Sequence, residues 1–433
     1  MTDRRPVLIE RAALVGLVTG DARRVDEEHS LEELAGLADA AGARIILRVL
    51  QERPKPDPAT FLGRGKVELL AQAAAEADVD VVIFDNELSP AQLRELTKRL
   101  ARRVVDRTQL ILDIFAKRAR TREGKLQVEL AQLKYLLPRL VGAGGELSRL
   151  GGGIGTRGPG ETKLETDRRK IRTRIHALQQ EIDEVRRRRS QLRDRRHKAA
   201  VPTVALVGYT NAGKTTLFNR LTAADAVASD ALFVTLDPLV RRARLADRRE
   251  LLVSDTVGFI DRLPHALVAA FRATLEETAE ADLVLHVIDA ANPERERHVA
   301  AVLRVLAEVG ATEVPRIEVF NKVDQITADE RRRLQEADPG AALISAVTGE
   351  GCDALLEAVT SRLALDQQRV RIDLDMATPA DAERLAWVYR HGRVLSQVTA
   401  GTRVVLEAEL PRRLVDRLQG AAPVARRAGG ARE

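Results

Sequence analysis

Residues 208–215 read Gly-Tyr-Thr-Asn-Ala-Gly-Lys-Thr, which is the pattern of a phosphate-binding loop. The glycines allow a tight backbone path, so that successive N–H groups and the following helix N-terminus would face phosphate oxygens. Lys214 would reach the β- and γ-phosphates, and the Thr215 hydroxyl would bind Mg²⁺. An apolar run at 204–207 and a helical pattern from 216 supply the strand–loop–helix setting that the motif requires. The loop therefore predicts a nucleoside-triphosphate site.

A second motif, Asn-Lys-Val-Asp at 321–324, indicates which base the nucleotide carries. The Asp324 carboxylate can accept from guanine N1–H and from the exocyclic amine, a charge-assisted pair that adenine cannot complete. We expect Asn321 to stabilise the loop and face the base edge, and the Lys322 stem to cover the ring. A later turn would bring the Ala346 N–H to guanine O6. In this order along the chain, the motifs predict a GTP site.

Three further residues are spaced to sense the metal and the γ-phosphate. Thr235 lies in a stretch without helical pattern and would close its hydroxyl onto Mg²⁺. Asp255 ends a strand-like run and would hold Mg²⁺ through water, while the Gly258 N–H would meet the γ-phosphate. We expect the metal ligands to be Thr215, Thr235 and Asp255, and the catalytic residues to be Lys214, Thr235 and Gly258.

The whole predicted nucleotide-binding set comes from five segments, of which 232–238 is called switch I below. The set consists of Gly208, Tyr209, Thr210, Asn211, Ala212, Gly213, Lys214, Thr215, Phe233, Val234, Thr235, Leu236, Asp237, Asp255, Thr256, Val257, Gly258, Asn321, Lys322, Val323, Asp324, Ser345, Ala346 and Val347.

Phe259 follows the glycine of the Asp-x-x-Gly loop, where many GTPases have a glutamine that orients the attacking water. A phenyl ring cannot polarise water. We therefore expect slow intrinsic GTP hydrolysis that accelerates when a partner reshapes the site.

Two helical patterns, at 127–137 and 162–197, flank glycine-rich stretches and predict an antiparallel hairpin. Apolar residues of the second helix recur in steps of four and three, from Ile171 to Val185, as in a coiled-coil seam. The same helix is rich in arginine, with a continuous run at 186–189. A charge run is usually a solvated helix face, but the excess of one sign favours an arm that contacts nucleic-acid phosphates.

The chain of 433 residues is long enough for about two to four domains. Its net charge of +6 fits either an anionic partner or an arginine-rich surface that aids solubility. The single cysteine, Cys352, excludes an internal disulfide and a cysteine-based zinc site, as expected for a reducing cytosol. No apolar run is long enough to span a bilayer, so we expect a cytoplasmic protein without stable membrane insertion. We also expect a monomer.

The fold class expected is α/β: a P-loop GTPase domain of the Ras-like type between two smaller domains. Alternating strand and helix patterns predict a small N-terminal domain with a parallel sheet. Ser30 would cap a helix at 30–41, with Glu33 completing a capping box, and Ser89 would cap the helix that begins at Pro90. The domains expected are 1–115 (N-terminal α/β), 116–199 (helical hairpin with a glycine-rich tip), 200–365 (GTPase) and 366–433 (small α+β with a disordered tail).

Together these segments resemble the HflX-type GTPases, a ribosome-associated family. The resemblance extends from the N-terminal domain to Val347, and Phe259 matches the family form. Leu239-Val240 departs from it, since the family often has threonines there. The most specific motifs of the resemblance are at 84–90, 105–115 and 158–165, and the segments 235–238 and 255–260 also match the family form.

The resemblance implies binding to the large ribosomal subunit, with the basic helical hairpin contacting rRNA. It also implies that the GTP form splits stalled or idle ribosomes or regulates their dormancy under stress. Members are associated with ATP binding by the N-terminal domain, which would give 63–66 (Gly-Arg-Gly-Lys) a role, although we favour a turn at the start of a helix for these residues. The alternatives are a hibernation or assembly factor that does not split ribosomes, and a GTPase acting on another structured RNA.

Overall fold

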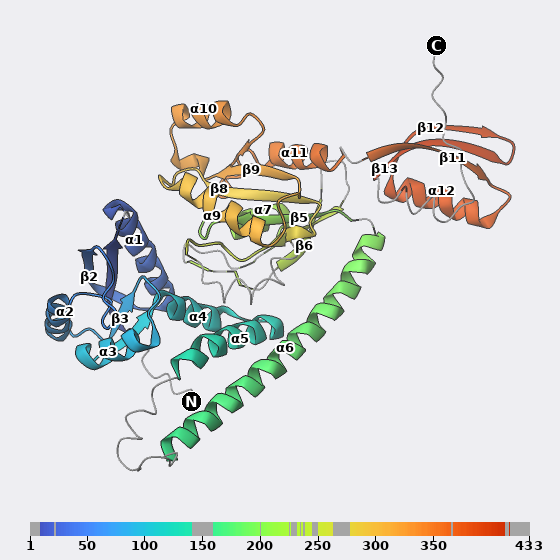
Figure 1. Cartoon of the computed structure of the whole chain (residues 1–433). Helices are drawn as coiled ribbons and strands as arrows, with labels where there is room; N and C mark the ends of the chain where they lie inside the picture. The colour runs from blue at the N-terminus through green and yellow to red at the C-terminus, as the bar shows by residue number, and fades with distance from the viewer. Residues whose placement is uncertain are drawn as a thin grey trace, which may run out of the picture.

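The computed structural model describes residues 9–20, 23–140, 159–199, 201–224, 226, 232–233, 235–236, 239–244, 250–262, 278–364, 367–411 and 415. Three separate sheets organise these residues, and each forms the centre of one body in Figure 1. The arrangement confirms the expected fold class. A long helix, α6, runs beneath the first two bodies and joins them (Figure 1).

The N-terminal body is a four-stranded parallel sheet with strand order β2-β1-β3-β4. Apolar side chains of β1 alternate between two cores, one on each face, as expected for a sheet covered by helices on both sides. Its elements are β1 (Arg11–Thr19), α1 (Arg24–Ala41), β2 (Arg44–Arg53), α2 (Arg64–Glu76), β3 (Val81–Phe84), α3 (Pro90–Leu100), β4 (Arg103–Asp106) and α4 (Arg107–Arg118).

The two serine caps expected in this domain have opposite outcomes. Ser89 caps α3 in a complete capping box with Gln92, and Pro90 is the first helical residue, as predicted. The prediction for Ser30 is wrong, because α1 begins six residues earlier and Ser30 lies within it. The buried Ser30 hydroxyl donates to the Asp85 carboxylate at 2.6 Å instead. Glu33 is therefore free of any capping role and turns toward the next domain.

The predicted hairpin consists of α5 (Arg122–Arg139) and α6 (Pro159–Ala199). The helices are antiparallel, since Arg122 pairs with Glu181 whereas Glu129, further along α5, pairs with Arg174. Part of the predicted seam packs against α5, in a cluster of Leu126, Leu130, Leu178 and Ile182. The glycine-rich tip at 142–145 and 151–158 lies outside the described residues.

The central body is a six-stranded sheet with order β10-β9-β8-β5-β7-β6, parallel except for β6. Because β5 lies between β7 and β8, the loops after these strands meet at one edge, where α/β sheets bind ligands. The elements are β5 (Thr203–Gly208), α7 (Lys214–Thr222), β6 (Leu239–Arg244), β7 (Glu250–Asp255), β8 (Leu283–Asp289), α9 (Arg295–Glu308), β9 (Arg316–Asn321), α10 (Ala328–Ala337), β10 (Ala342–Leu343) and α11 (Cys352–Ala364).

The C-terminal body is a small antiparallel sheet of order β11-β13-β12 with one helix against it. Val388 of the helix packs on Leu406 and Leu410 of the central strand in a core of its own, with Trp387 at its margin. The elements are β11 (Gln367–Asp375), α12 (Pro379–His391), β12 (Arg393–Ala400) and β13 (Arg403–Pro411). The expected disordered tail, from about Gly420, lies outside the described residues.

Candidate nucleotide-binding and hydrolysis site

The phosphate loop connects the end of β5 to the start of α7 and depends on its two glycines. Gly208 has φ 156°, and a Cβ there would lie 2.2 Å from the Val287 carbonyl oxygen. Gly213 has φ 91°, and a Cβ would lie 2.2 Å from Asn321 Nδ2. A side chain at Gly208 would clash with the backbone of β8, and one at Gly213 would clash with Asn321, so the close approach of the base-recognition motif requires glycine at 213.

Lys214 is the first residue of α7 and is buried beneath the loop. Its ammonium donates to the Tyr209 carbonyl oxygen at 2.7 Å. Burial lowers the pKa of Lys214 to about 8, and the charge of Asp255 only partly opposes this. The phosphates of a bound nucleotide would supply the negative charge that this buried ammonium lacks.

The three predicted metal ligands lie together. Thr215 Oγ1 lies 2.8 Å from Asp255 Oδ2 and 2.8 Å from Thr235 Oγ1, and Thr235 Oγ1 lies 3.0 Å from Asp255 Oδ2. Burial raises the pKa of Asp255, against the effects of Lys214 and the two hydroxyls. The other carboxylate oxygen, Oδ1, is buried and has no hydrogen-bond partner among the described residues.

This oxygen-only donor set fits Mg²⁺, which binds one or two protein oxygens, nucleotide phosphates and water. Thr215, Thr235 and Asp255 would hold the ion, and it would neutralise charge on the β- and γ-phosphates. Since Thr235 comes from switch I, its presence in this cluster means that switch I is closed over the phosphate site.

The base-recognition loop is braced by Asn321. Its amide donates to the Ala212 carbonyl at 2.8 Å, and its carbonyl accepts from the Ala346 N–H at 2.9 Å. Asn321 thereby ties three loops together. The Asp324 carboxylate is exposed in the cavity and has no described partner, so it is free to accept from a base. Lys322 pairs with Asp289 at 2.7 Å.

The Ala346 N–H donates to the Asn321 side chain at 2.9 Å. This bond satisfies a buried donor within the protein. Its contact with guanine O6 stays a prediction.

A cavity of about 300 Å³ lies over the phosphate loop, and most of the residues that line it belong to the predicted nucleotide-binding set. Ala212, Asp255 and Ala346 lie just beneath this lining, and Val234 and Asp237 fall outside the described residues. Thr216 and Gln325 line the cavity without having been predicted, although each directly follows a predicted motif. The predicted residues in the lining are Thr210, Asn211, Gly213, Lys214, Thr215, Phe233, Thr235, Thr256, Gly258, Asn321, Lys322, Asp324, Ser345 and Val347.

The remaining predicted residues support the site from behind. Gly208 and Val323 hold the backbone of their loops, with Val323 N–H donating to Ile344 O at 3.2 Å. Leu236 and Val257 are buried in the core, and Tyr209 points away from the cavity.

Phe259 is buried in the core that joins the N-terminal and central bodies. That core also holds Phe115 of α4 and Phe233 of switch I, whose rings lie 4.7 Å apart, edge to face. Phe259 therefore anchors its loop to the domain interface and is not among the residues that line the cavity.

These elements, in this order and geometry, define a GTP-binding domain of the P-loop class. Three family descriptions match the chain: "GTP-binding GTPase N-terminal" over 28–116, "GTP-binding GTPase Middle Region" over 118–196 and "50S ribosome-binding GTPase" over 203–322. The chain belongs to the HflX GTPase family, as its sequence motifs predicted, and it is a GTPase.

The relatives cover most of the chain. GTPase HflX of Lacrimispora saccharolytica is 45% identical over 405 residues, or 94% of each protein. GTPase HflX of Caldanaerobacter subterraneus subsp. tengcongensis is 50% identical over 354 residues, or 82% of this chain and 81% of the relative. GTPase HflX of Escherichia coli is 50% identical over 357 residues, or 82% and 83%. Among the described helices, none has the length and apolar character needed to cross a membrane.

Proposed function

We propose that this GTPase binds the large ribosomal subunit in its GTP form and splits stalled or idle ribosomes under stress. The single observation that carries the nucleotide part is the convergence of Thr215, Thr235 and Asp255 on one metal position. The ribosomal part is supported by the match to "50S ribosome-binding GTPase" over 203–322. We expect it to act as a cytoplasmic monomer associated with ribosomes.

In this proposal, bound GTP and Mg²⁺ would order switch I and the loop that contains Gly258. The γ-phosphate would hold the Gly258 N–H, and Mg²⁺ would hold Thr235, so that hydrolysis releases both. Intrinsic hydrolysis should be slow because Phe259 replaces the usual glutamine. GTP turnover with and without purified large subunits tests this, and equal rates would contradict it.

The hairpin is the proposed rRNA-contacting arm, and its charge is distributed unevenly. In the first half of α6 the basic side chains lie near acids, as with Arg168 and Arg172 beside Glu165 and Arg174 on Glu129. From 186 to 199 Asp194 is the only acid among many arginines. We assign the stronger phosphate contact to this second half, which ends beside the central domain (Figure 1).

Replacing the four arginines at 186–189 by alanine should weaken binding to the large subunit. It should also reduce the steepness of the plot of log binding constant against log salt concentration, by about 0.7–0.9 in slope for each lost phosphate contact. GTP affinity should be retained. A matched variant, Arg172→Ala with Arg174→Ala, removes cations that already pair with Glu165 and Glu129 and should change the slope less. Equal slopes in the two variants would contradict the assignment.

Sedimentation of 70S ribosomes with a non-hydrolysable GTP analogue tests the splitting activity. Separation into subunits supports splitting, whereas co-migration with intact ribosomes identifies a hibernation factor.

ATP binding at 63–66 stays a prediction. In the structure Gly63 precedes α2 and its N–H donates to Gln51 Oε1 at 3.0 Å. Competition between labelled ATP and excess GTP distinguishes a second site from the GTP site.

A further inference from the structure

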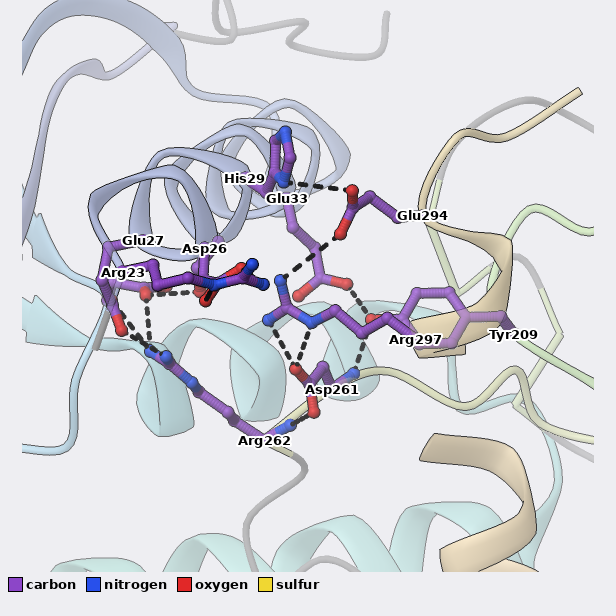
Figure 2. A network of polar contacts seen from close by, with 12 residues as sticks. Arg23, Asp26, Glu27, His29, Glu33, Tyr209, Asp261, Arg262, Glu294 and Arg297 are labelled. Carbon is purple, nitrogen blue, oxygen red and sulfur yellow. Dashed lines mark hydrogen bonds and ion pairs between the residues drawn. The ribbon is translucent and has the colours of Figure 1, made fainter. Parts of the chain in front are cut away.

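Tyr209 belongs to the phosphate loop, but its side chain points to the N-terminal domain. Its hydroxyl donates to the Glu33 carboxylate of α1 and accepts the Asp261 N–H at 2.6 Å (Figure 2). Its ring stacks on His298 of α9, with centroids 3.7 Å apart and planes 5° from parallel. One hydroxyl therefore connects three parts of the molecule: α1, the phosphate loop and the segment that follows Gly258.

The N-terminal side of this contact is held rigidly. Arg107, buried at the start of α4, pairs with Glu33 and lies 2.8 Å from Asp85. Arg107 also donates to the Asp261 carbonyl at 3.1 Å, so it contacts the central domain directly. Arg262 reaches back to Glu27 at 2.5 Å. Charged groups of both domains thus satisfy one another across the interface.

The segment 255–262, called switch II here, is held to the phosphate loop by three hydrogen bonds, two between backbone groups and one to a side chain. Thr210 N–H donates to the Phe259 carbonyl at 2.7 Å, and Phe259 N–H donates to the Gly208 carbonyl at 3.1 Å. The third bond is Asp261 N–H to the Tyr209 hydroxyl. Gly258, the expected γ-phosphate contact, lies directly before these bonds and packs on Thr210, where a Cβ would meet the Thr210 Cα at 2.9 Å.

We propose that the Tyr209 hydroxyl is a positioning group that couples docking of the N-terminal domain to the presence of the γ-phosphate. It holds switch II in the closed arrangement in which Gly258 can reach the phosphate, and Glu33 orients it. The inference rests on the proposed role of Gly258 in sensing GTP. It adds the contact through which the N-terminal domain would respond to the γ-phosphate.

Coupling of this kind is reciprocal. If a docked N-terminal domain favours closed switches, GTP must favour the docked domain by the same factor, while GDP, which lacks the γ-phosphate, must do so less. Loss of the hydroxyl should therefore change the discrimination between GTP and GDP. A side chain that is only structural would weaken both nucleotides equally.

The test is Tyr209→Phe in the full chain, which keeps the ring and its stacking on His298. Affinities for GDP and for a non-hydrolysable GTP analogue are measured by titration calorimetry without ribosomes. We expect the affinity for the analogue to fall about 5- to 20-fold relative to GDP. An unchanged ratio of the two affinities would overturn the proposal.

Tyr135→Phe is the matched control. Tyr135 is also buried and also donates to a buried carboxylate, Asp106 at 2.8 Å, but it lies on α5 and does not touch switch II. It should cost similar stability and leave the ratio of affinities unchanged. If Tyr135→Phe alters the ratio as much as Tyr209→Phe, the effect is general destabilisation and the proposal is wrong.

A double-mutant cycle identifies the partner. With Glu33→Ala and Tyr209→Phe, the effects on the ratio should be clearly less than additive, because both changes break one chain of contacts. Additive effects would remove Glu33 from the proposal. Should Glu33→Ala fail to fold, Tyr209→Phe alone still decides the role of the hydroxyl. Because ribosomes are absent, this test can fail while ribosome splitting is confirmed.

Discussion

The two sides of the phosphate loop are built on opposite principles. On the nucleotide side, charged groups are only partly paired: burial lowers the pKa of Lys214 although its ammonium donates to the Tyr209 carbonyl, and one oxygen of Asp255 has no described partner. On the far side, Tyr209, Glu33 and Arg107 are paired in an interdomain network. A bound nucleotide would complete the interactions of the charged groups on the first side, whereas other protein groups already do so on the second.

This difference separates binding from stability. Groups left unsatisfied gain most when phosphates and Mg²⁺ arrive, so their loss should weaken nucleotide binding more than folding. Groups that satisfy one another in the interior should matter most for folding, because removal of one leaves the others buried and unpaired.

The largest effect is expected at the exposed end of the nucleotide side. Asp324→Asn replaces the carboxylate that accepts two guanine protons by an amide that matches xanthine. Preference for GTP over XTP should change by about 1,000-fold or more, since a site built for hydrogen bonding rejects a mismatched base strongly. Competition binding of the two nucleotides measures this. Unchanged selectivity would remove Asp324 from the base site.

On the far side, Arg107→Ala should destabilise the protein by about 3–5 kcal/mol, because it removes the buried cation that Glu33 and Asp85 share and leaves Asp85 with the half-buried Arg262 at 3.3 Å. Urea unfolding measures the change. Arg23→Ala is the control: Arg23 pairs with Asp26 on the surface, and its loss should leave the transition almost unmoved. Similar destabilisation in both variants would contradict the distinction between the two kinds of pair.

The same contrast explains what the sequence could predict. Lys214, Thr215 and Asp255 follow from spacing, because a strand, a loop and a helix in fixed order bring them to one edge of a sheet. Ser89 was predicted as a cap for a similar reason, since Pro90 follows it directly, and its capping-box partner Gln92 is likewise close in sequence.

The far side depends on contacts between residues distant in sequence. Glu33 lies 176 residues from Tyr209, and its local pattern with Ser30 indicated a capping box that does not form. Local hydrogen bonding was outweighed by packing of α1 on α4 and the central domain. In the sequence, such a contact is indicated only by a polar residue on the apolar face of a predicted helix. This signal does not identify the partner residue.

Lys214→Ala should lower nucleotide affinity by about 100-fold, as for removal of one preorganised group that stabilises phosphate charge. The protein should stay folded with a similar unfolding midpoint, since the lost cation is not part of a buried ion-pair network. Fluorescent-nucleotide binding and thermal unfolding of the same preparation test both points. A loss of stability as large as that of Arg107→Ala would contradict the proposed division between the two sides.

The smallest effect is a pH dependence on the far side. Burial raises the pKa of Glu33 above its usual 4.5, and the opposing contacts with Arg107 and Tyr209 do not cancel this. The folded state therefore holds the proton more tightly, so this contribution to stability is complete below pH 4.5 and is lost as pH rises through the raised pKa. Glu33→Gln cannot titrate.

The unfolding free energy of wild type should thus fall relative to that of Glu33→Gln as pH rises from 4.5 through the raised pKa. The slope should be at most about tenfold in the unfolding equilibrium per pH unit, because one proton is involved. Urea unfolding of both proteins at several pH values measures it. A difference that does not vary with pH would mean that the contacts with Arg107 and Tyr209 offset the burial of Glu33 completely.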